Sequence, residues 1–230
     1  MLRVQSERQR DLENQPLPDP LPADPLALAA AWLDDARATI PDNPTAMTLA
    51  TVDERGQPDA RMVLCRGFDR TQGWLAFYTD RESRKGRQLD ASPNAALVFY
   101  WEPLRRQLRV RGPVVRAPDA DSDAYFASRP GGAQVSALTS HQSQPIDTRQ
   151  ALLDAHIATA RRLGIAVASE QPAGVARPER WGGYRVWIES IEFWIGQLSR
   201  LHDRVRYTRE LDRTALERSS QSWRAARLQP

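Results

Sequence analysis

The chain contains little cysteine, lysine or histidine, and it has no long apolar run. Cys65 is the only cysteine among 230 residues, which excludes an internal disulfide and suits a reducing cytoplasm. The histidines (His141, His156 and His202) lie far apart and lack the spacing of metal ligands, so we expect no metal site. No segment approaches the roughly 20 apolar residues of a membrane span, and the N-terminus has no apolar signal region. These absences predict a cytoplasmic protein that does not enter a membrane.

The charge is mildly basic and evenly spread. There are 32 Lys plus Arg against 29 Asp plus Glu, a net charge of +3 and a pI near 9.4. Nucleic-acid-binding proteins concentrate such charge in stripes or tails, whereas here arginine is mixed with acidic residues almost everywhere. We therefore expect local anion pockets and no nucleic-acid partner. Lys85 is the only lysine.

The stretch from Met47 to Leu89 predicts such a pocket. Alternating apolar residues indicate strands over 47–52, 60–68 and 74–79. Ser83 then caps a helix that carries Arg84 and Lys85 in its first turn. Since a helix N-terminus offers unpaired N–H groups and a positive dipole end, two cations there favour a phosphate. Cations in a first turn are also often merely solvated, so both interpretations stay open at this point.

The remaining pattern predicts a mainly β fold with peripheral helices. Residues 1–23 are polar and rich in proline, which indicates a flexible arm. The rest, 24–230, we expect to be a single domain. Short strands joined by tight turns favour an antiparallel barrel over a parallel sheet. Further helices are expected over 24–39, 119–128, 133–140 (after a break at Gly131-Gly132) and 148–163, and further strands over 94–101, 107–116, 183–194 and 200–209.

The motif RLHDR places Arg200, His202 and Arg204 at alternate positions. On a regular strand all three share one face, where their charges repel unless a ligand offsets them. Trp194 lies upstream and offers an aromatic surface beside that face. This combination suits a planar electron-accepting ring, although a solvated arginine-rich edge has the same pattern.

An ordered set of motifs resembles the pyridoxamine 5′-phosphate oxidase family. The resemblance extends from about Leu21 to Pro230, and only the ordered set is specific. The motifs are ARMVLCRGFD, FYTDRESRKGRQL, YWEPLRRQLRVRG, YFASRP, SHQS, WGGYRV, IEFWIG, RLHDRVRY and the terminal RLQP.

The resemblance implies an FMN-binding split β-barrel that forms a homodimer with FMN at the subunit interface. The positions that match flavin-binding residues of the family are Arg61, Met62, Val63, Leu64, Arg66, Tyr78, Thr79, Arg84, Lys85, Gln107, Gln142, Ser143, Trp194 and Arg204. Arg66, Tyr125 and Arg129 match the pocket for the substrate's phosphate. Arg200 and His202 match catalytic residues that also bind the substrate at its pyridine ring.

The implied reaction is oxidation of pyridoxamine or pyridoxine 5′-phosphate to pyridoxal 5′-phosphate. A hydride passes from the substrate's C4′ carbon to flavin N5, and molecular oxygen then reoxidises the flavin and yields hydrogen peroxide. In this scheme Arg200 fixes the pyridine ring, His202 holds or polarises the substrate, and Arg204 stabilises the reduced flavin.

Two positions depart from the family pattern. Arg66 stands where the family usually has lysine, and Ala133 stands where it usually has a serine that completes the substrate-phosphate site. Two other interpretations therefore stay open. One is a related FMN oxidase that acts on a different ring, as in phenazine biosynthesis. The other is a non-catalytic protein that holds FMN or pyridoxal phosphate.

Overall fold

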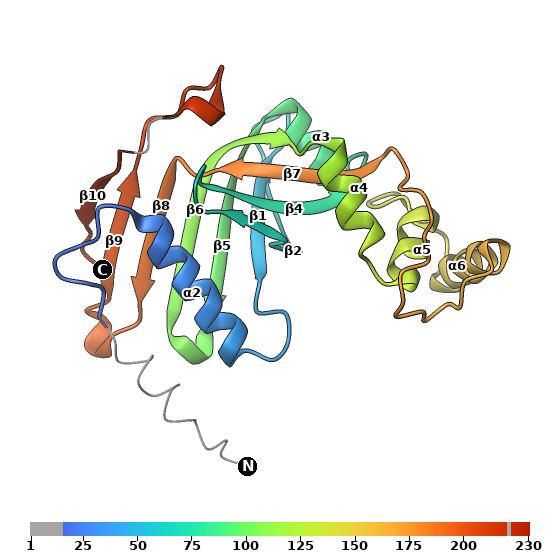
Figure 1. The fold of residues 1–230 in the computed structure, drawn as a ribbon, viewed down its shortest axis with the longest axis horizontal. Coiled ribbons are helices and arrows are strands. Elements are labelled where there is room, and N and C mark those ends of the chain that lie inside the picture. Colours follow the sequence, from blue (N-terminus) through green and yellow to red (C-terminus); the bar gives the residue numbers. More distant parts are fainter. Residues whose placement is uncertain (1–15, 220–221) are drawn as a thin grey trace, which may run out of the picture.

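Figure 1 shows the computed structural model, which describes residues 16–219 and 222–230. A curled antiparallel sheet carries one helix across its concave side, and three further helices extend away from one end. The elements in chain order are α2 (Pro25–Thr39), β1 (Ala46–Val52), β2 (Pro58–Leu64), β3 (Gly67–Asp69), β4 (Trp74–Asp80), α3 (Arg84–Ala91), β5 (Asn94–Trp101), η1 (Glu102–Leu104), β6 (Arg106–Arg116), α4 (Asp119–Ala127), α5 (Gly131–Thr139), α6 (Arg149–Leu163), β7 (Trp181–Trp187), β8 (Ser190–Ile195), η2 (Leu198–Arg200), β9 (Asp203–Thr208), η3 (Leu216–Arg218) and β10 (Arg224–Arg227).

The sheet curls because β6 pairs with two different strands. In the described residues the main order is β10-β9-β8-β6-β5-β1-β2, and β7, β4 and β3 branch from it. The first half of β6 pairs with β8, and its last residues, Val114 to Arg116, pair with β7. Gly112 lies at this junction, where a Cβ atom would collide with the Trp187 carbonyl oxygen. This arrangement confirms the predicted fold class, a split β-barrel with peripheral helices.

The core lies between α2 and the inward rows of the sheet. Asp24 caps α2 by accepting the Leu26 N–H at 2.8 Å, and proline occupies the first helical position, as expected. Trp32 of α2 meets Phe193 of β8 edge to face at 5.0 Å between ring centroids. The fully buried side chains of the sheet include Leu49, Leu97, Phe99, Val110, Ile191, Phe193, Val205 and Tyr207.

Two strands that the sequence predicted as continuous are each divided. The segment 60–68 contains the end of β2, which pairs with β1, and the start of β3, which pairs with β4. The segment 183–194 contains parts of β7 and β8, which separate near Ile188 because they pair with opposite ends of β6. Alternation of apolar residues continues through such corners, so the pattern did not reveal them.

The RLHDR motif does not form one regular strand. Ser199 and Arg200 have left-handed backbone conformations, with φ of 55° and 60°, and β9 begins only at Asp203. Arg200 belongs to the turn η2, so the prediction that Arg200, His202 and Arg204 share a strand face is wrong. The predicted last strand, 200–209, shortens accordingly, and β10 follows it without having been predicted.

The helical section agrees with the sequence except at the start of α5. Gly131 and Gly132, expected to break the chain, begin this helix. Their N–H groups donate to the carbonyl oxygens of Gln171 and Ser169 at 2.9 and 3.0 Å. A Cβ atom on Gly131 would lie 2.9 Å from the Gln171 oxygen, so the loop approaches the helix because glycine leaves room.

Helix α6 is present as predicted, but its apolar side is largely uncovered. Leu152, Leu153 and Ile157 remain 38–40% exposed, and Ala160 is the buried residue of this helix. No helix among the described residues combines the length and apolarity that crossing a membrane requires. The expected cytoplasmic location stays a prediction.

The expected flexible arm, 1–23, lies mostly outside the described residues. In its described part, the Leu17 side chain is buried and the Leu17 N–H donates to Asp203 Oδ2 at 2.8 Å. Arg227 donates to the Pro18 carbonyl oxygen at 3.1 Å. These bonds attach residues 17–18 to β9 and β10. The division into an arm and one domain stays a prediction.

Candidate functional site

Lys85 lies among polar side chains at the start of α3. The Ser83 hydroxyl caps this helix by accepting the Gly86 N–H at 3.3 Å. The Lys85 ammonium donates to Ser83 Oγ at 3.1 Å and to Gln142 Oε1 at 2.9 Å. The Thr79 hydroxyl donates to the same amide oxygen at 3.0 Å. We call Thr79, Ser83, Lys85 and Gln142 the cradle; it unites three predicted site residues from β4, α3 and the segment after α5.

The electrostatics of the cradle favour an anion. Burial lowers the pKa of Lys85, the nearby Arg61 lowers it further, and Asp80 opposes both. Among the described residues, Lys85 takes part in a salt bridge with none of the carboxylates. A half-buried ammonium beside a second cation gains most from a negative ligand, and the helix start adds the positive end of its dipole. The charge of a phosphate group suits this arrangement.

Arg61 and Arg84 flank the cradle, but both are engaged by Asp59. Arg61 forms a salt bridge with Asp59 at 2.7 Å and also donates to Thr51 Oγ1 at 2.6 Å. Arg84 Nε lies 3.3 Å from Asp59, and the Arg84 side chain is 65% exposed. Asp59 was not predicted as a site residue, because an isolated acid before a strand gives no sequence signal.

Tyr78 precedes Thr79 on β4 and points to the opposite face of the strand. It stacks on Tyr125 of α4 with ring centroids 4.2 Å apart, and Trp181 of β7 stacks on both rings at 5.6 and 6.0 Å. Gly183 makes room, since a Cβ atom there would lie 2.7 Å from Tyr78 Cε1. The predicted flavin and substrate residues Tyr78 and Tyr125 are thus in direct contact.

Arg129 adjoins this stack and forms a second candidate anion site. Its guanidinium lies 4.7 Å from the Trp181 ring centroid, and its Nη1 atom is buried without a hydrogen-bond partner. Burial lowers the pKa of Arg129; Tyr125 raises it and Arg66 lowers it again. A buried unpaired donor costs about 1–3 kcal/mol, which a bound anion recovers. Of the predicted phosphate-binding residues, Arg129 and Tyr125 therefore both adjoin Trp181.

The other predicted residues of this region are more peripheral. Arg66 is exposed and lines a polar groove of about 440 Å³ with Arg37 and Arg70. On β2, Met62 is 61% exposed. Val63 and Leu64 are partly buried, and Ser143, with φ of 72°, is exposed.

Gln107, Trp194 and Arg204 form one row across β6, β8 and β9. They lie on the side of the sheet opposite the core, which we call the outer face. Arg204 donates to Glu192 Oε1 at 2.7 Å and to the Gln229 carbonyl oxygen at 2.9 Å. The row places the Trp194 indole beside the Arg204 guanidinium, and two acceptors hold that guanidinium in position.

His202 stands beside this row, whereas Arg200 is exposed in the turn before it. The His202 and Trp194 ring centroids are 4.6 Å apart. His202 Nδ1 accepts the Gln197 N–H at 3.2 Å, so a neutral imidazole here carries its proton on Nε2. That leaves Nε2–H as the donor available to a ligand.

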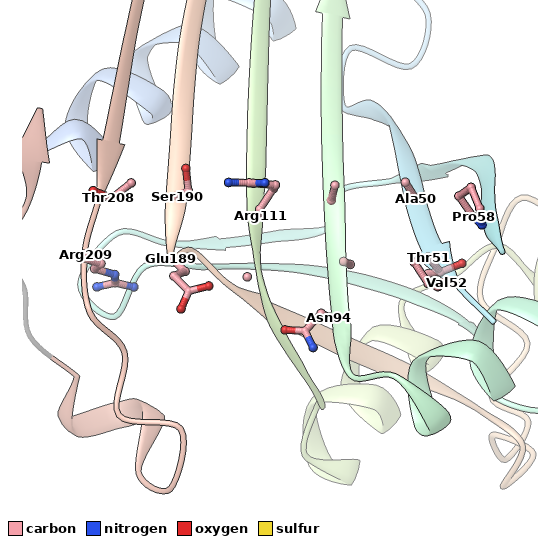
Figure 2. Close-up of a pocket in the computed structure, with 13 residues that line it drawn as sticks. Ala50, Thr51, Val52, Pro58, Asn94, Arg111, Glu189, Ser190, Thr208 and Arg209 are labelled. Atoms are coloured by element: carbon pink, nitrogen blue, oxygen red, sulfur yellow. The ribbon is translucent and has the colours of Figure 1, made fainter. Parts of the chain in front are cut away.

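The cradle and the outer-face row are separate within one chain. Among the described residues, no hydrogen bond, salt bridge or ring contact joins the two sets. A groove of about 560 Å³ crosses the strand ends of the outer face (Figure 2), and none of the predicted site residues lines it. It follows one register row of Ala50, Ala96, Arg111, Ser190 and Thr208.

No group of three His, Cys, Asp or Glu side chains in residues 16–219 and 222–230 is arranged for a metal ion. Cys65 is buried, and burial raises the pKa of its thiol to about 11. The candidate chemistry therefore rests on the two anion sites and the outer-face row.

Comparison with known proteins identifies the family. Residues 33–163 match the family model of pyridoxamine 5′-phosphate oxidase, and 181–230 match the pyridoxine 5′-phosphate oxidase C-terminal dimerisation region. The chain belongs to the pyridoxamine 5′-phosphate oxidase family. It is 50% identical over 187 residues to pyridoxine/pyridoxamine 5′-phosphate oxidase of Azorhizobium caulinodans, covering 81% of this chain and 84% of the relative. It is 45% identical over 207 residues to the enzyme of Burkholderia lata, covering 90% and 89%.

Solved structures agree with this assignment. PhzG from Burkholderia lata, in complex with tetrahydrophenazine-1-carboxylic acid, superposes with a TM-score of 0.78 at 27% identity, covering 99% of this chain and 98% of that one. An FMN-binding protein from Nostoc punctiforme, 18% identical with a TM-score of 0.67 over 89% and 96% of the chains, supports the fold. As a family member, the chain is an FMN-dependent oxidoreductase with a C-terminal dimerisation region.

Proposed function

We propose that the protein oxidises pyridoxamine 5′-phosphate or pyridoxine 5′-phosphate to pyridoxal 5′-phosphate. The observation that carries the proposal is the buried, unpartnered Nη1 of Arg129 beside the stacked Tyr125. The Arg129 guanidinium lies over the Trp181 ring, and Trp181 in turn stacks on Tyr125. A buried cation next to flat aromatic rings suits a ligand that combines a phosphate with a small aromatic ring.

The cradle would hold the phosphate of FMN through Lys85 and Thr79, with Arg61 and Arg84 beside it. When bound, FMN supplies the ring that takes up a hydride and passes electrons to oxygen. The donor carbon loses a hydride and its heteroatom a proton, and O₂ takes up both as H₂O₂. For the amine substrate, water then releases ammonia.

The chain's own residues bind and orient the substrate. Arg129 and Arg66 hold its phosphate, and Arg200 confines the pyridine ring. His202 donates from Nε2, because Nδ1 already accepts a main-chain N–H. Arg204, fixed by Glu192, places positive charge beside the flavin ring.

The separation of the cradle from the outer-face row supports a site shared by two protomers. Trp194, His202 and Arg204 lie within the matched dimerisation region. We therefore assign each flavin to the cradle of one protomer and the outer face of its partner. Coexpression of Lys85→Ala with Arg204→Ala tests this. At an FMN concentration well below its dissociation constant for Lys85→Ala, each variant alone should be nearly inactive, whereas their mixed dimer should regain activity through one intact site. Mixed dimers that stay inactive would place both halves in one chain.

The main experiment is an absorbance spectrum after FMN loading, followed by oxygen uptake with each phosphate. We expect a flavin spectrum and uptake with stoichiometric peroxide. A protein that stays colourless with FMN contradicts the flavin site. A flavin-loaded protein without uptake on any substrate would instead be a binding protein.

The second candidate is a phenazine-type oxidase. The superposition with PhzG favours it, and so does the first turn of α5, which offers few donors to a phosphate. Ala133 offers no hydroxyl, and the first N–H groups of α5 are used by the 169–171 loop. Oxygen uptake with tetrahydrophenazine-1-carboxylic acid, but not with the phosphates, would select this function.

A further inference from the structure

We propose that Asp80 and Arg180, an ion pair behind the cradle, are positioning residues that set the affinity for the flavin phosphate by holding Gln142 against Lys85. The inference rests on the proposed flavin site and adds to it two residues outside the predicted binding set. Neither side chain touches Lys85 through a hydrogen bond; both act on the segment that carries Gln142.

Asp80 is the last residue of β4, and its side chain is only 4% exposed. One carboxylate oxygen, Oδ1, accepts the Glu82 N–H at 2.8 Å. The other, Oδ2, accepts the Gln142 N–H at 3.4 Å and Arg180 Nε at 3.3 Å. The Asp80 carbonyl oxygen accepts the Ser83 hydroxyl at 2.6 Å. Asp80, itself in β4, therefore binds both the start of α3 and the segment that carries Gln142.

Arg180 connects this carboxylate to the end of α5. Its Nη2 atom donates to the carbonyl oxygens of Ala137, Leu138 and Ser140 at 2.8, 3.1 and 3.3 Å. The last carbonyls of a helix have no partner within it, so a guanidinium there satisfies them and opposes the negative dipole end. The segment that leads to Gln142 is thus held at Ser140 by Arg180 and at Gln142 by Asp80.

The geometry requires a forked cation. Nε of Arg180 serves Asp80 while Nη2 serves the helix end, and a single ammonium cannot occupy both positions. Without the pair, the 140–142 segment loses the bonds by which Asp80 and Arg180 tie it to β4. The amide oxygen of Gln142 then no longer orients the Lys85 ammonium toward a phosphate. Asp80 also opposes the lowering of the pKa of Lys85, which favours the charged form of that ammonium.

The test measures dissociation constants of FMN and riboflavin by flavin fluorescence in the full-length protein. Arg180→Gln should raise the dissociation constant of FMN roughly tenfold, the size expected for one lost charge-assisted hydrogen bond. The dissociation constant of riboflavin should rise less than about twofold. Arg180→Lys keeps the charge but not the fork, so we expect it to weaken FMN at least about fivefold. If Lys restores wild-type affinity, charge alone matters and the positioning role is wrong.

Arg177→Gln is the matched control. Arg177 lies in the same loop and its side chain is 9% exposed, but its salt bridges go to Asp119 and Asp123 of α4. This variant should lower the melting temperature without changing the ratio of FMN to riboflavin affinity. An equal loss of FMN selectivity in Arg177→Gln would mean that the loop acts only through general stability.

Asp80→Asn provides a second route if Arg180 variants do not fold. It keeps the acceptor for Glu82 but weakens the bond to Arg180, so on its own it should weaken FMN binding more than riboflavin binding. Where Arg180→Gln does fold, the double variant should lose less than the sum of the single effects. Additive effects contradict the pair. If the wild-type protein binds no FMN, the proposed function fails. If Lys85→Ala weakens FMN while the Arg180 variants do not, only this inference fails.

Discussion

Lys85 and Arg129 are two half-buried cations in similar electrostatic settings, yet their hydrogen bonding differs. Burial lowers the pKa of each, and in each case one neighbouring arginine lowers it further: Arg61 for Lys85 and Arg66 for Arg129. Lys85 donates to two oxygens of the cradle. Arg129 is held by aromatic rings, and its Nη1 is unpaired.

The difference indicates how each site meets its ligand. In the cradle, a hydroxyl and an amide oxygen orient the ammonium. The Arg129 site is positioned by ring contacts that supply no hydrogen-bond acceptor, so its ligand must supply the missing partner. A tightly held cofactor suits the first arrangement, and a substrate that enters and leaves suits the second.

Arg129→Ala should give the largest effect, on substrate alone. It removes a cation that can form two parallel bonds to a phosphate, which should cost about 3 kcal/mol of binding free energy. The KM for pyridoxamine 5′-phosphate should therefore rise about 150-fold. Steady-state oxygen uptake measures this change, with the FMN dissociation constant as control. Loss of FMN in this variant would show that the two anion sites are one.

Lys85→Ala should give the complementary effect, on FMN. Removing one charge-assisted bond should weaken FMN by about 1.5–3 kcal/mol and riboflavin, which lacks the phosphate, much less. Fluorescence titration measures both ligands. Arg87→Ala is the matched control, since Arg87 is an exposed cation of the same helix that donates to the Glu82 carbonyl oxygen. A similar loss of FMN affinity in both variants would mean that the positive charge of the helix as a whole, and not a specific bond from Lys85, binds the phosphate.

The two sites also differ in how far the sequence could predict them. Ser83, Arg84 and Lys85 are visible because a helix cap and its first turn are local features. Gln142 came from family resemblance alone. Asp80 and Arg180 gave no signal, because their contact joins positions 100 residues apart.

The outer face shows where strand alternation fails as a predictor. Gln107, Trp194 and Arg204 do share a face, but Arg200 does not lie on that strand. Its left-handed conformation, and that of Ser199, occur without the glycine or asparagine that usually marks such a turn. Pairing partners, which depend on the whole sheet, likewise divided the strands at 60–68 and 183–194.

A smaller effect should come from pH, and only at the cradle. Phosphate binding needs the charged form of Lys85, whose pKa lies below its ordinary 10.5. FMN affinity should therefore be constant from about pH 7, where the phosphate is a dianion (second pKa about 6), up to that lowered pKa, and should decrease as the pH rises through it. Lys85→Arg stays charged and should give a flat profile, and riboflavin titrated in parallel corrects for ionisation of the flavin ring. A decrease that persists in Lys85→Arg would assign the titration to another group.

Ala133→Ser should give the smallest effect and should act at the Arg129 site. A hydroxyl in the first turn of α5 can supply a donor to the substrate phosphate that the site now lacks. The Pro130 carbonyl oxygen competes for it, although it already accepts the N–H groups of Ala133 and Gln134 at 2.9 and 3.0 Å. One neutral hydrogen bond contributes about 0.5–1.5 kcal/mol, so with this competition we expect a KM about two- to fivefold lower for pyridoxamine 5′-phosphate.

Two controls decide whether that gain belongs to the phosphate. Pyridoxamine without its phosphate should show no change in KM with Ala133→Ser. Ala137→Ser, one turn later on the same helix, should leave the KM for the phosphorylated substrate unchanged. A gain shared by pyridoxamine would mean that the hydroxyl acts on helix stability rather than on the ligand. An unchanged or raised KM for pyridoxamine 5′-phosphate would mean that position 133 does not face the phosphate, and the phenazine-type function would then gain support over phosphate recognition at Arg129.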